Sequence, residues 1–422
     1  MNRIVLIGNG FDLAHGLKTS YADFINWYWD VVKEKILGSL SNIYDDGLCF
    51  VKSNKSWPQG FWAVFTYDIN IGNNRELPGK DFVDFLGESC NMQVVFSPLL
   101  EAIMHNITEQ KWVDIERIYY TLLCKSLKGD SKLSPVQLNN QLSALTNKLQ
   151  EYLQTVEESV DKSEMLKDSI SRKIFSPIQF KDIAVCASQQ KRDYINELKE
   201  SNPVRLRIKL ADYERWRKFL QYNIADSINK IKEDGKILDY NFDMVSDLFL
   251  PEQIMFVNFN YTKIADLYIP ASQSNNTFSV NHIHGTLENS ESMIFGYGDE
   301  MDKHYEELAD FNDNEYLNNV KSIRYLEASN YHRLLEFVES APYQIYIMGH
   351  SCGNSDRTLL NTLFEHENCI SIKPFYFVRP DGTDNYRELV QNISRNFKDK
   401  QALRAKVVPK DCCEPLPQAS AN

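Results

Sequence analysis

The stretch that decides the fold is RIVLIGNGFD, residues Arg3–Asp12. Its apolar run from Ile4 to Ile7 is continuous rather than alternating, which is typical of a strand buried on both faces of a parallel sheet. Glycines then end the strand in a turn. A helix is predicted to begin near Ser20, where Asp23 stands three residues later as in a capping box. The N-terminal segment therefore predicts the strand–turn–helix order of an α/β fold.

Strand and helix signals alternate again from residue 253 onward. Strands are predicted over 253–258, 280–284, 293–295, 343–348 and 370–378, and helices over 332–339, 355–364 and 385–397. Such alternation implies a parallel sheet with helices on both faces. We therefore predict that residues 1–38 and 246–400 form one Rossmann-like domain. Residues 401–422, which hold three prolines, are predicted to be a disordered tail.

Residues 39–245 show few strand signals, and we predict a large all-helical insertion. Helices are expected over 110–126, 134–156 and 206–231. Ser134, Pro135 and Gln137 form a strong helix start. Apolar residues then recur every three or four positions, namely Leu138, Leu142, Leu145, Leu149, Tyr152 and Val156. This spacing fits either a coiled-coil seam or one long helix inside a bundle.

Composition excludes several classes of protein. The 46 basic and 58 acidic residues give a net charge of −12, so we expect no nucleic-acid partner, which would require a basic face. The eight cysteines include no CxxC pair, which argues against a zinc ribbon and for reduced thiols. No apolar run approaches the roughly 20 residues of a membrane span, and no secretion signal is present. We expect a cytoplasmic protein with no membrane partner.

The turn after the first strand is the first candidate binding element. Glycines at a strand end allow backbone N–H groups to approach a phosphate, and the helix that follows favours negative charge. The candidate nucleotide contacts are Gly8, Asn9, Gly10 and Phe11, with Asp12 beside them. The spacing is not GxGxxG, because Leu13 stands at the third glycine position. A plain strand-to-helix turn is the alternative.

Two further motifs follow predicted strands. Asn260 stands at the carboxyl edge of the sheet, where an amide can hold ribose or water, although helix capping by Asn260 or Thr262 is equally consistent. His282 and His284 point to one face of the next strand. They could bind a metal, but no ligand stands nearby in the sequence to complete a set. His284, next to Gly285 at the strand end, is the better candidate for a general base.

The loop over 349–356 is a second candidate cradle for phosphate or ribose, through Gly349, Ser351 and Asp356. Its GHSCG sequence also fits a hydrolase nucleophile elbow, GxSxG. Two other stretches carry acids beside helix or strand ends. WVDIE over 112–116 begins a predicted helix, and its acidic residues can interact favourably with the helix N-terminus. FGYGDE over 295–300 runs from a predicted strand into a turn.

Six stretches together resemble the AbiH family of bacterial phage abortive-infection proteins, in that family's order along nearly the whole chain. They are GNGFDLAHGLKTSYADF from Gly8, WVDIE from Trp112, NFNYT from Asn258, HIHG from His282, FGYGDE from Phe295 and MGHSCGNSD from Met348. The family is associated with defence in which the infected cell stops growing or dies.

The motif order also resembles the sirtuin/DHS-like NAD-binding fold. This resemblance implies that Gly8 and Gly10 face phosphates, that Asn260 orients ribose or water, and that His284 is the base. It places Gly349, Ser351 and Asp356 near the other half of the nucleotide. Sirtuin deacylases carry a Cys-paired zinc module, which this chain lacks, so a protein deacylase is disfavoured. Sirtuin motifs place Asp where Thr262 stands here, and Asp12 is the candidate replacement.

The resemblance implies a phage-defence effector that binds NAD and hydrolyses its nicotinamide–ribose bond. Asn260, His284 and Asp12 would be catalytic, and no metal would be needed. One alternative is a non-catalytic nucleotide-binding sensor that signals to a partner. Another is a metal-dependent nuclease built on Asp299, Glu300 and Asp12. Because a toxic activity must be restrained, we also expect a phage-derived trigger, a partner protein or a homo-oligomer formed through the helical insertion.

Overall fold

The first predicted strand is the central strand of a parallel sheet in the computed structural model of the chain. All six residues of β1 (Asn2–Ile7) are buried. β1 pairs with β5 (Ile254–Asn258) on one side and β7 (Tyr343–Met348) on the other. β6 (Phe278–His282) pairs with β5, and β8 (Cys369–Phe375) pairs with β7. The five-stranded sheet therefore has the order β6-β5-β1-β7-β8. The continuous apolar run is explained, because a central strand has both faces covered.

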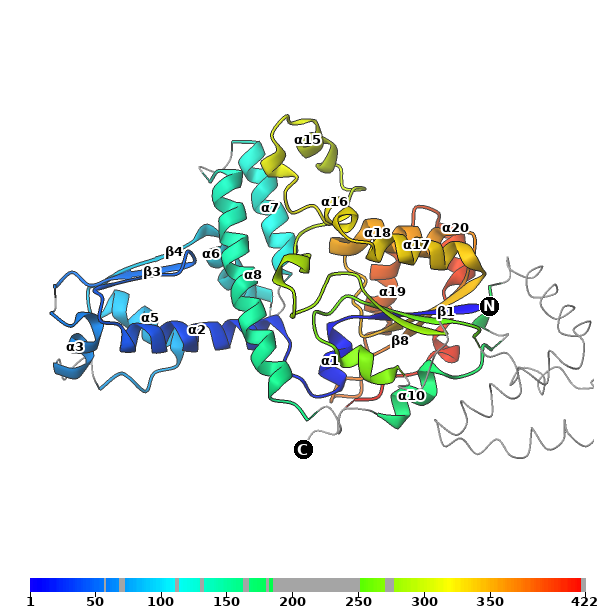
Figure 1. Cartoon of the computed structure of the whole chain (residues 1–422), viewed down its shortest axis with the longest axis horizontal. Helices are drawn as coiled ribbons and strands as arrows, with labels where there is room; N and C mark the ends of the chain where they lie inside the picture. Colours follow the sequence, from blue (N-terminus) through cyan, green and yellow to red (C-terminus); the bar gives the residue numbers. More distant parts are fainter. Residues whose placement is uncertain are drawn as a thin grey trace, which may run out of the picture. The chain divides into compact units, whose positions relative to one another are not determined.

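Helices cover this sheet on both faces (Figure 1). In that view α17 (Asn330–Ser340) and α18 (Arg357–Glu365) lie above the strands and α10 (Asp168–Ile174) lies below them. α17 packs against β6, while β8 contacts α18, α19 (Tyr386–Arg395) and α20 (Lys400–Lys406). The predicted α/β class with a parallel sheet is therefore confirmed. The short helix α1 (Asn9–Ala14) follows β1 after the single residue Gly8.

The structure describes residues 1–56, 58–67, 73–110, 114–129, 133–161, 167–179, 182–184, 251–269 and 277–418. The chain divides into two compact units. Unit 1 holds the parallel sheet and comprises residues 1–17, 160–286 and 325–422, and unit 2 comprises residues 18–159 and 287–324. These boundaries differ from the expected ones, because residues 18–38 and 287–324 are grouped with unit 2 and residues 160–245 with unit 1.

Unit 2 is built mainly of helices. α2 (Tyr21–Gly38) begins at Ser20, whose side chain accepts a hydrogen bond from the Asp23 backbone as predicted. α8 (Pro135–Glu158) begins with the predicted capping box of Ser134 and Gln137 and packs against α2, α6 and α7. The apolar seam therefore belongs to one long helix in a bundle. The other helices described in this unit are α3 (Gly60–Tyr67), α5 (Gly79–Glu88), α6 (Pro98–Gln110), α7 (Ile115–Leu127), α15 (Tyr305–Asp310) and α16 (Lys321–Arg324).

The prediction that residues 39–245 are all helical is wrong. Three short strands form an antiparallel sheet in unit 2, in the order β2 (Ile43–Asp45), β3 (Cys49–Lys52) and β4 (Gln93–Phe96). Each has only three or four residues. Such strands are too short for an alternating pattern to be distinguished from a loop.

Two C-terminal expectations also differ from the structure. Residues 293–295 form no strand; Tyr297 instead pairs with Val320 through an isolated bridge. The tail predicted to be disordered from residue 401 contains most of α20, and Val407 and Pro415 pair with Ile372 and Tyr376. The helix predicted over 206–231 lies outside the described residues.

Candidate functional site

The candidate site residues follow strands of one parallel sheet, so their loops meet at its carboxyl edge. Residues 8–12 follow β1, residues 259–262 follow β5, residues 283–285 follow β6 and residues 349–356 follow β7. Neighbouring β1 and β7 lie where the strand order changes direction, since β5 and β6 extend the sheet to one side and β8 to the other. In open α/β sheets this position forms the ligand-binding crevice.

The glycine turn after β1 packs backbone to backbone against the loop after β7. The Gly10 N–H donates to the Gly349 carbonyl at 2.9 Å. A β-carbon on Gly8 would lie 2.6 Å from the Cα of His350, and one on Gly349 would lie 2.0 Å from the nitrogen of Phe11. The three glycines are therefore required by this packing, whether or not a phosphate binds here. Asn9 is exposed beside them.

Phe11 belongs to the core of unit 1. Its ring is fully buried and contacts the rings of His15 and Tyr268, with centroids 4.6 and 5.5 Å away. Any contact between Phe11 and a ligand therefore has to come from its backbone.

Asp12 and Asn260 are brought together by the structure. Asn260 Nδ2 donates to Asp12 Oδ1 at 2.8 Å and to the Gly8 carbonyl at 3.1 Å, and Thr262 Oγ1 donates to Asp12 Oδ2 at 2.6 Å. Thr262 thus binds an aspartate that comes from another loop. The short 3-10 helix over Ile264–Tyr268 begins after Lys263, and no side chain caps its N-terminus. Asn260 and Thr262 therefore do not cap this helix.

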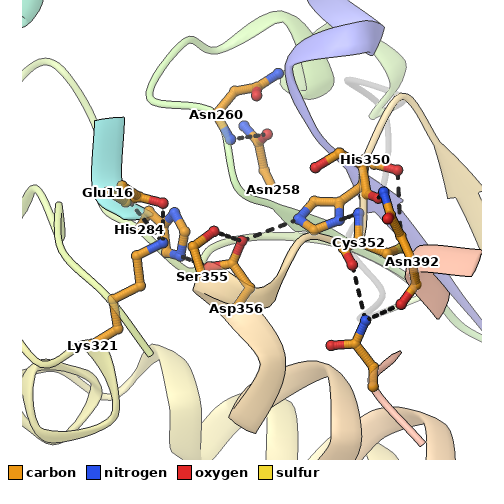
Figure 2. A network of polar contacts seen from close by, with 12 residues as sticks. Glu116, Asn258, Asn260, His284, Lys321, His350, Cys352, Ser355, Asp356 and Asn392 are labelled. Carbon is orange, nitrogen blue, oxygen red and sulfur yellow. Dashed lines mark hydrogen bonds and ion pairs between the residues drawn. The ribbon is translucent and has the colours of Figure 1, made fainter. Parts of the chain in front are cut away.

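His284 and Asp356 form the second pair. His284 Nε2 lies 3.3 Å from Asp356 Oδ1 (Figure 2). The same nitrogen lies 3.1 Å from the hydroxyl of Tyr325. The two side chains are 6% and 10% exposed. A carboxylate facing one imidazole nitrogen orients the ring and stabilises its protonated form, which is the arrangement a general base requires.

His350 faces the same carboxylate, and sequence reasoning did not select it. Its Nε2 lies 3.6 Å from Asp356 Oδ2, and its Nδ1 accepts a hydrogen bond from the Cys352 N–H at 3.0 Å (Figure 2). The available signal was its place inside the 349–356 motif. Tyr325 was also missed, and no local motif marks it.

The loop after β5 joins the two pairs. Asn260 reaches Asp12, whereas the ring of the preceding residue, Phe259, contacts the rings of His284 and His350 at centroid distances of 5.0 and 4.1 Å. The ring of Tyr261 lies 6.5 Å from that of His284. The predicted residues therefore gather at one sheet edge, in two hydrogen-bonded groups connected by this loop.

His282 has partners different from those of His284. Its Nε2 lies 3.0 Å from Asp266 Oδ2, and its Nδ1 lies 3.3 Å from Asn258 Nδ2. The two histidines thus do not share a ligand set. No group of three or more potential metal ligands occurs in the part of the chain that the structure describes. The carboxylate cluster that the nuclease alternative requires is therefore not found among those residues.

The nucleophile-elbow interpretation gains no support from the loop after β7. Ser351 is exposed, and Asn392 Nδ2 donates to its carbonyl at 2.9 Å. Cys352 is fully buried, and burial and then the nearby Asp356 raise the pKa of its thiol well above the ordinary value, which makes it a poor nucleophile. The Nε2 atom of His350 faces Asp356, so it is not placed to act as a base for Ser351 or Cys352.

The motifs over 112–116 and 295–300 meet within unit 2. Glu116 Oε1 accepts from Lys321 Nζ at 2.8 Å and from the Gly296 N–H at 3.4 Å. A β-carbon on Gly296 would lie 2.0 Å from the carbonyl oxygen of Asn319. Trp112 itself lies outside the described residues. These contacts give both motifs a structural role in holding unit 2 together.

Comparison with known proteins identifies the family. The family model for bacteriophage abortive infection AbiH matches residues 4–378. No curated protein and no solved structure matches the chain. Within the described residues, no helix is long and apolar enough to cross a membrane. Because the family match spans most of the sequence, including every loop of the candidate site, the chain belongs to the AbiH family of bacteriophage abortive-infection proteins.

Proposed function

We propose that this protein acts in abortive infection by hydrolysing the nicotinamide–ribose bond of NAD, with His284 as general base. The abortive-infection role follows from the family. The observation that carries the enzymatic step is the buried pair of His284 Nε2 and Asp356 Oδ1, 3.3 Å apart at the carboxyl edge of the sheet. A histidine held by a carboxylate in a buried site is suited to proton transfer near neutral pH.

The dinucleotide is favoured by the order of the strands. Numbered along the chain, the five sheet strands lie in the order 3-2-1-4-5, and dinucleotides bind to doubly wound sheets of this kind at the carboxyl ends of the central strands, where the order reverses. Both amide hydrogens of Asn260 are used by Asp12 and Gly8, so its carbonyl oxygen is the atom that would accept from a ribose hydroxyl. Asp12 then holds Asn260 in place and need not react.

In the proposed reaction, water attacks the ribose carbon as its bond to nicotinamide breaks. The bonding electrons leave with nicotinamide, which becomes neutral, and positive charge develops on the sugar ring. His284, with Nε2–H directed to Asp356, takes the proton of the water on Nδ1 and later releases it to solvent. The products are nicotinamide, ADP-ribose and one proton.

The test is NAD turnover measured by mass spectrometry. Purified wild type, His284→Gln and His282→Gln are incubated with NAD, with and without extract from phage-infected cells. We expect nicotinamide and ADP-ribose from wild type and from His282→Gln, because His282 pairs with Asp266 instead of Asp356. Loss of the base should slow turnover by about a hundredfold or more. Full turnover by His284→Gln would contradict its role.

A nucleotide sensor without catalysis is the second candidate, favoured by the burial of His284, which is only 4% exposed. It predicts that NAD binds and stays intact in both conditions. If NAD neither binds nor disappears, the nucleotide proposal itself is wrong.

A further inference from the structure

The loop after β7 is held by α19 in a conformation that is unusual for its residues. Asn396 Nδ2 donates to the Cys352 carbonyl and Asn392 Nδ2 to the Ser351 carbonyl, both at 2.9 Å. Cys352 has a φ of 53°, in the left-handed region that residues other than glycine seldom adopt. Asn396 is fully buried. The two amides therefore hold the backbone of the loop in a strained state.

This backbone conformation fixes the tautomer of His350. It turns the Cys352 N–H onto His350 Nδ1 at 3.0 Å. A ring nitrogen that accepts a hydrogen bond carries no proton, so the proton of the neutral imidazole is on Nε2. That nitrogen faces Asp356 Oδ2 at 3.6 Å, a long contact of the kind that shortens when a site is occupied.

Asp356 in turn is oriented by the two imidazoles. It stands at the N-cap of α18, where an aspartate ordinarily accepts a backbone N–H of the first turn, but its side chain makes no cap hydrogen bond. Oδ1 faces His284, and Oδ2 faces His350, with Ser355 Oγ at 3.4 Å from the same oxygen. The carboxylate thus bridges two buried histidines rather than stabilising the helix.

We propose that His350 is a positioning residue: through Nε2–H it holds the Asp356 carboxylate turned toward His284 and shares its negative charge. The role rests on the proposed function, in which His284 is the base, but the geometry behind it does not depend on the substrate. His350 thereby limits how strongly Asp356 stabilises the protonated form of His284.

Two substitutions separate the two contacts of His350. In His350→Asn, the side-chain oxygen can accept the Cys352 N–H as in an Asx turn, but the shorter side chain no longer reaches Asp356. In His350→Gln, the longer side chain can donate to Asp356 and the contact with Cys352 is lost. The pair therefore distinguishes an effect through Asp356 from an effect on loop structure.

The measurement is NMR of protein labelled with ¹⁵N-histidine, with the His284 and His350 signals assigned from His284→Gln and His350→Gln. The titratable groups facing His284 within unit 1 include Asp356, Tyr325 and Tyr261, and the His350 substitutions act on the hydrogen bonding of Asp356. In His350→Asn the carboxylate loses the Nε2–H of His350 and more of its charge acts on His284, so the titration midpoint of His284 should rise by about one pH unit. In His350→Gln it should stay close to that of wild type.

The wild-type spectrum must also show His350 protonated on Nε2 alone at neutral pH. Protonation on Nδ1, or equal His284 midpoints in wild type and His350→Asn, would overturn the proposal. If His350→Asn does not fold, the wild-type tautomer decides. NAD turnover is measured separately, so an inactive protein in which His284 titrates as expected would refute the proposed function and leave the role of His350 intact.

Discussion

Two buried histidines of unit 1 differ in what their ring nitrogens face. His284 faces the carboxylate of Asp356, whereas His15 lies between the Phe11 carbonyl and the Tyr268 hydroxyl, each 2.7 Å away. The carbonyl can only accept, so Nδ1 of His15 carries the proton and Nε2 accepts from Tyr268. Burial lowers the pKa of His15 to about 4. His15 is therefore a neutral structural residue, and it is the carboxylate that makes His284 suitable for proton transfer.

The environment of His15 predicts a loss of stability in mild acid. Its pKa falls from 6.5 in the unfolded chain to about 4 in the folded one, so between these values only the unfolded chain binds the proton. Stability should therefore rise with pH across this window; the contribution of about 3 kcal/mol is complete above about pH 6.5 and lost toward pH 4. Urea midpoints of wild type and His15→Gln across this range test it. Parallel pH profiles for the two proteins would contradict the assignment.

At the scale of elements, the contact between the loops after β1 and β7 is set by backbone atoms. Gly349 and Gly382 both have positive φ, 78° and 82°, but only Gly349 is crowded: a β-carbon there would lie 2.0 Å from the nitrogen of Phe11, and nothing lies within 4 Å at Gly382. We expect Gly349→Ala to destabilise unit 1 by more than about 3 kcal/mol. Gly382→Ala should cost about 1 kcal/mol from backbone strain alone. Equal shifts in their urea midpoints would show that strain, not loop packing, dominates at Gly349.

The sequence predicted the elements whose burial or capping produces a pattern in their own residues. β1 and β7 contain continuous apolar runs, Ile4 to Ile7 and Ile345 to Met348, because both faces are covered, and α8 carries its cap and its apolar stripe. β2 and β4 carry too few residues for a pattern. Their stability comes from pairing with β3, which a local pattern does not report.

The candidate site was predictable as separate loops but not as contacts. His284 and Asp356 each follow a strand, yet β6 and β7 are not neighbours in the sheet, so spacing alone does not bring them together. The Asp12–Asn260 pair likewise joins residues 248 positions apart. Tyr325 reaches His284 from a 3-10 turn over Tyr325–Glu327 that has no motif of its own. Each of these contacts depends on how distant segments pack together, and no single stretch of the sequence encodes that packing.

At the scale of the whole chain, the family motifs divide between two tasks. The loops over 8–12, 258–262, 282–285 and 348–356 supply the candidate site in unit 1. The motifs over 112–116 and 295–300 meet in unit 2, where Glu116 and the almost fully buried Lys321 form an ion pair. A buried pair of this kind joins the two segments, and losing one partner leaves an uncompensated charge. Residues 287–324 are thereby fastened to α7 within unit 2.

The burial of His284 bears on when the protein acts in a cell. Since only 6% of its side chain is exposed, the ring is closed to a substrate in the conformation described, so we expect NAD levels in uninfected cells to be unaffected by wild-type protein. After infection, cells carrying wild type or His282→Gln should lose NAD and release few phage. Cells carrying His284→Gln should keep their NAD and lose protection, while the purified variant melts within a few degrees of wild type, because the Gln side chain is of similar size and can still donate to Asp356. NAD content and phage yield are measured together in each strain. Protection that persists in His284→Gln would separate the defence role of the family from the proposed hydrolysis, and NAD loss without infection would show that the buried site opens without a trigger.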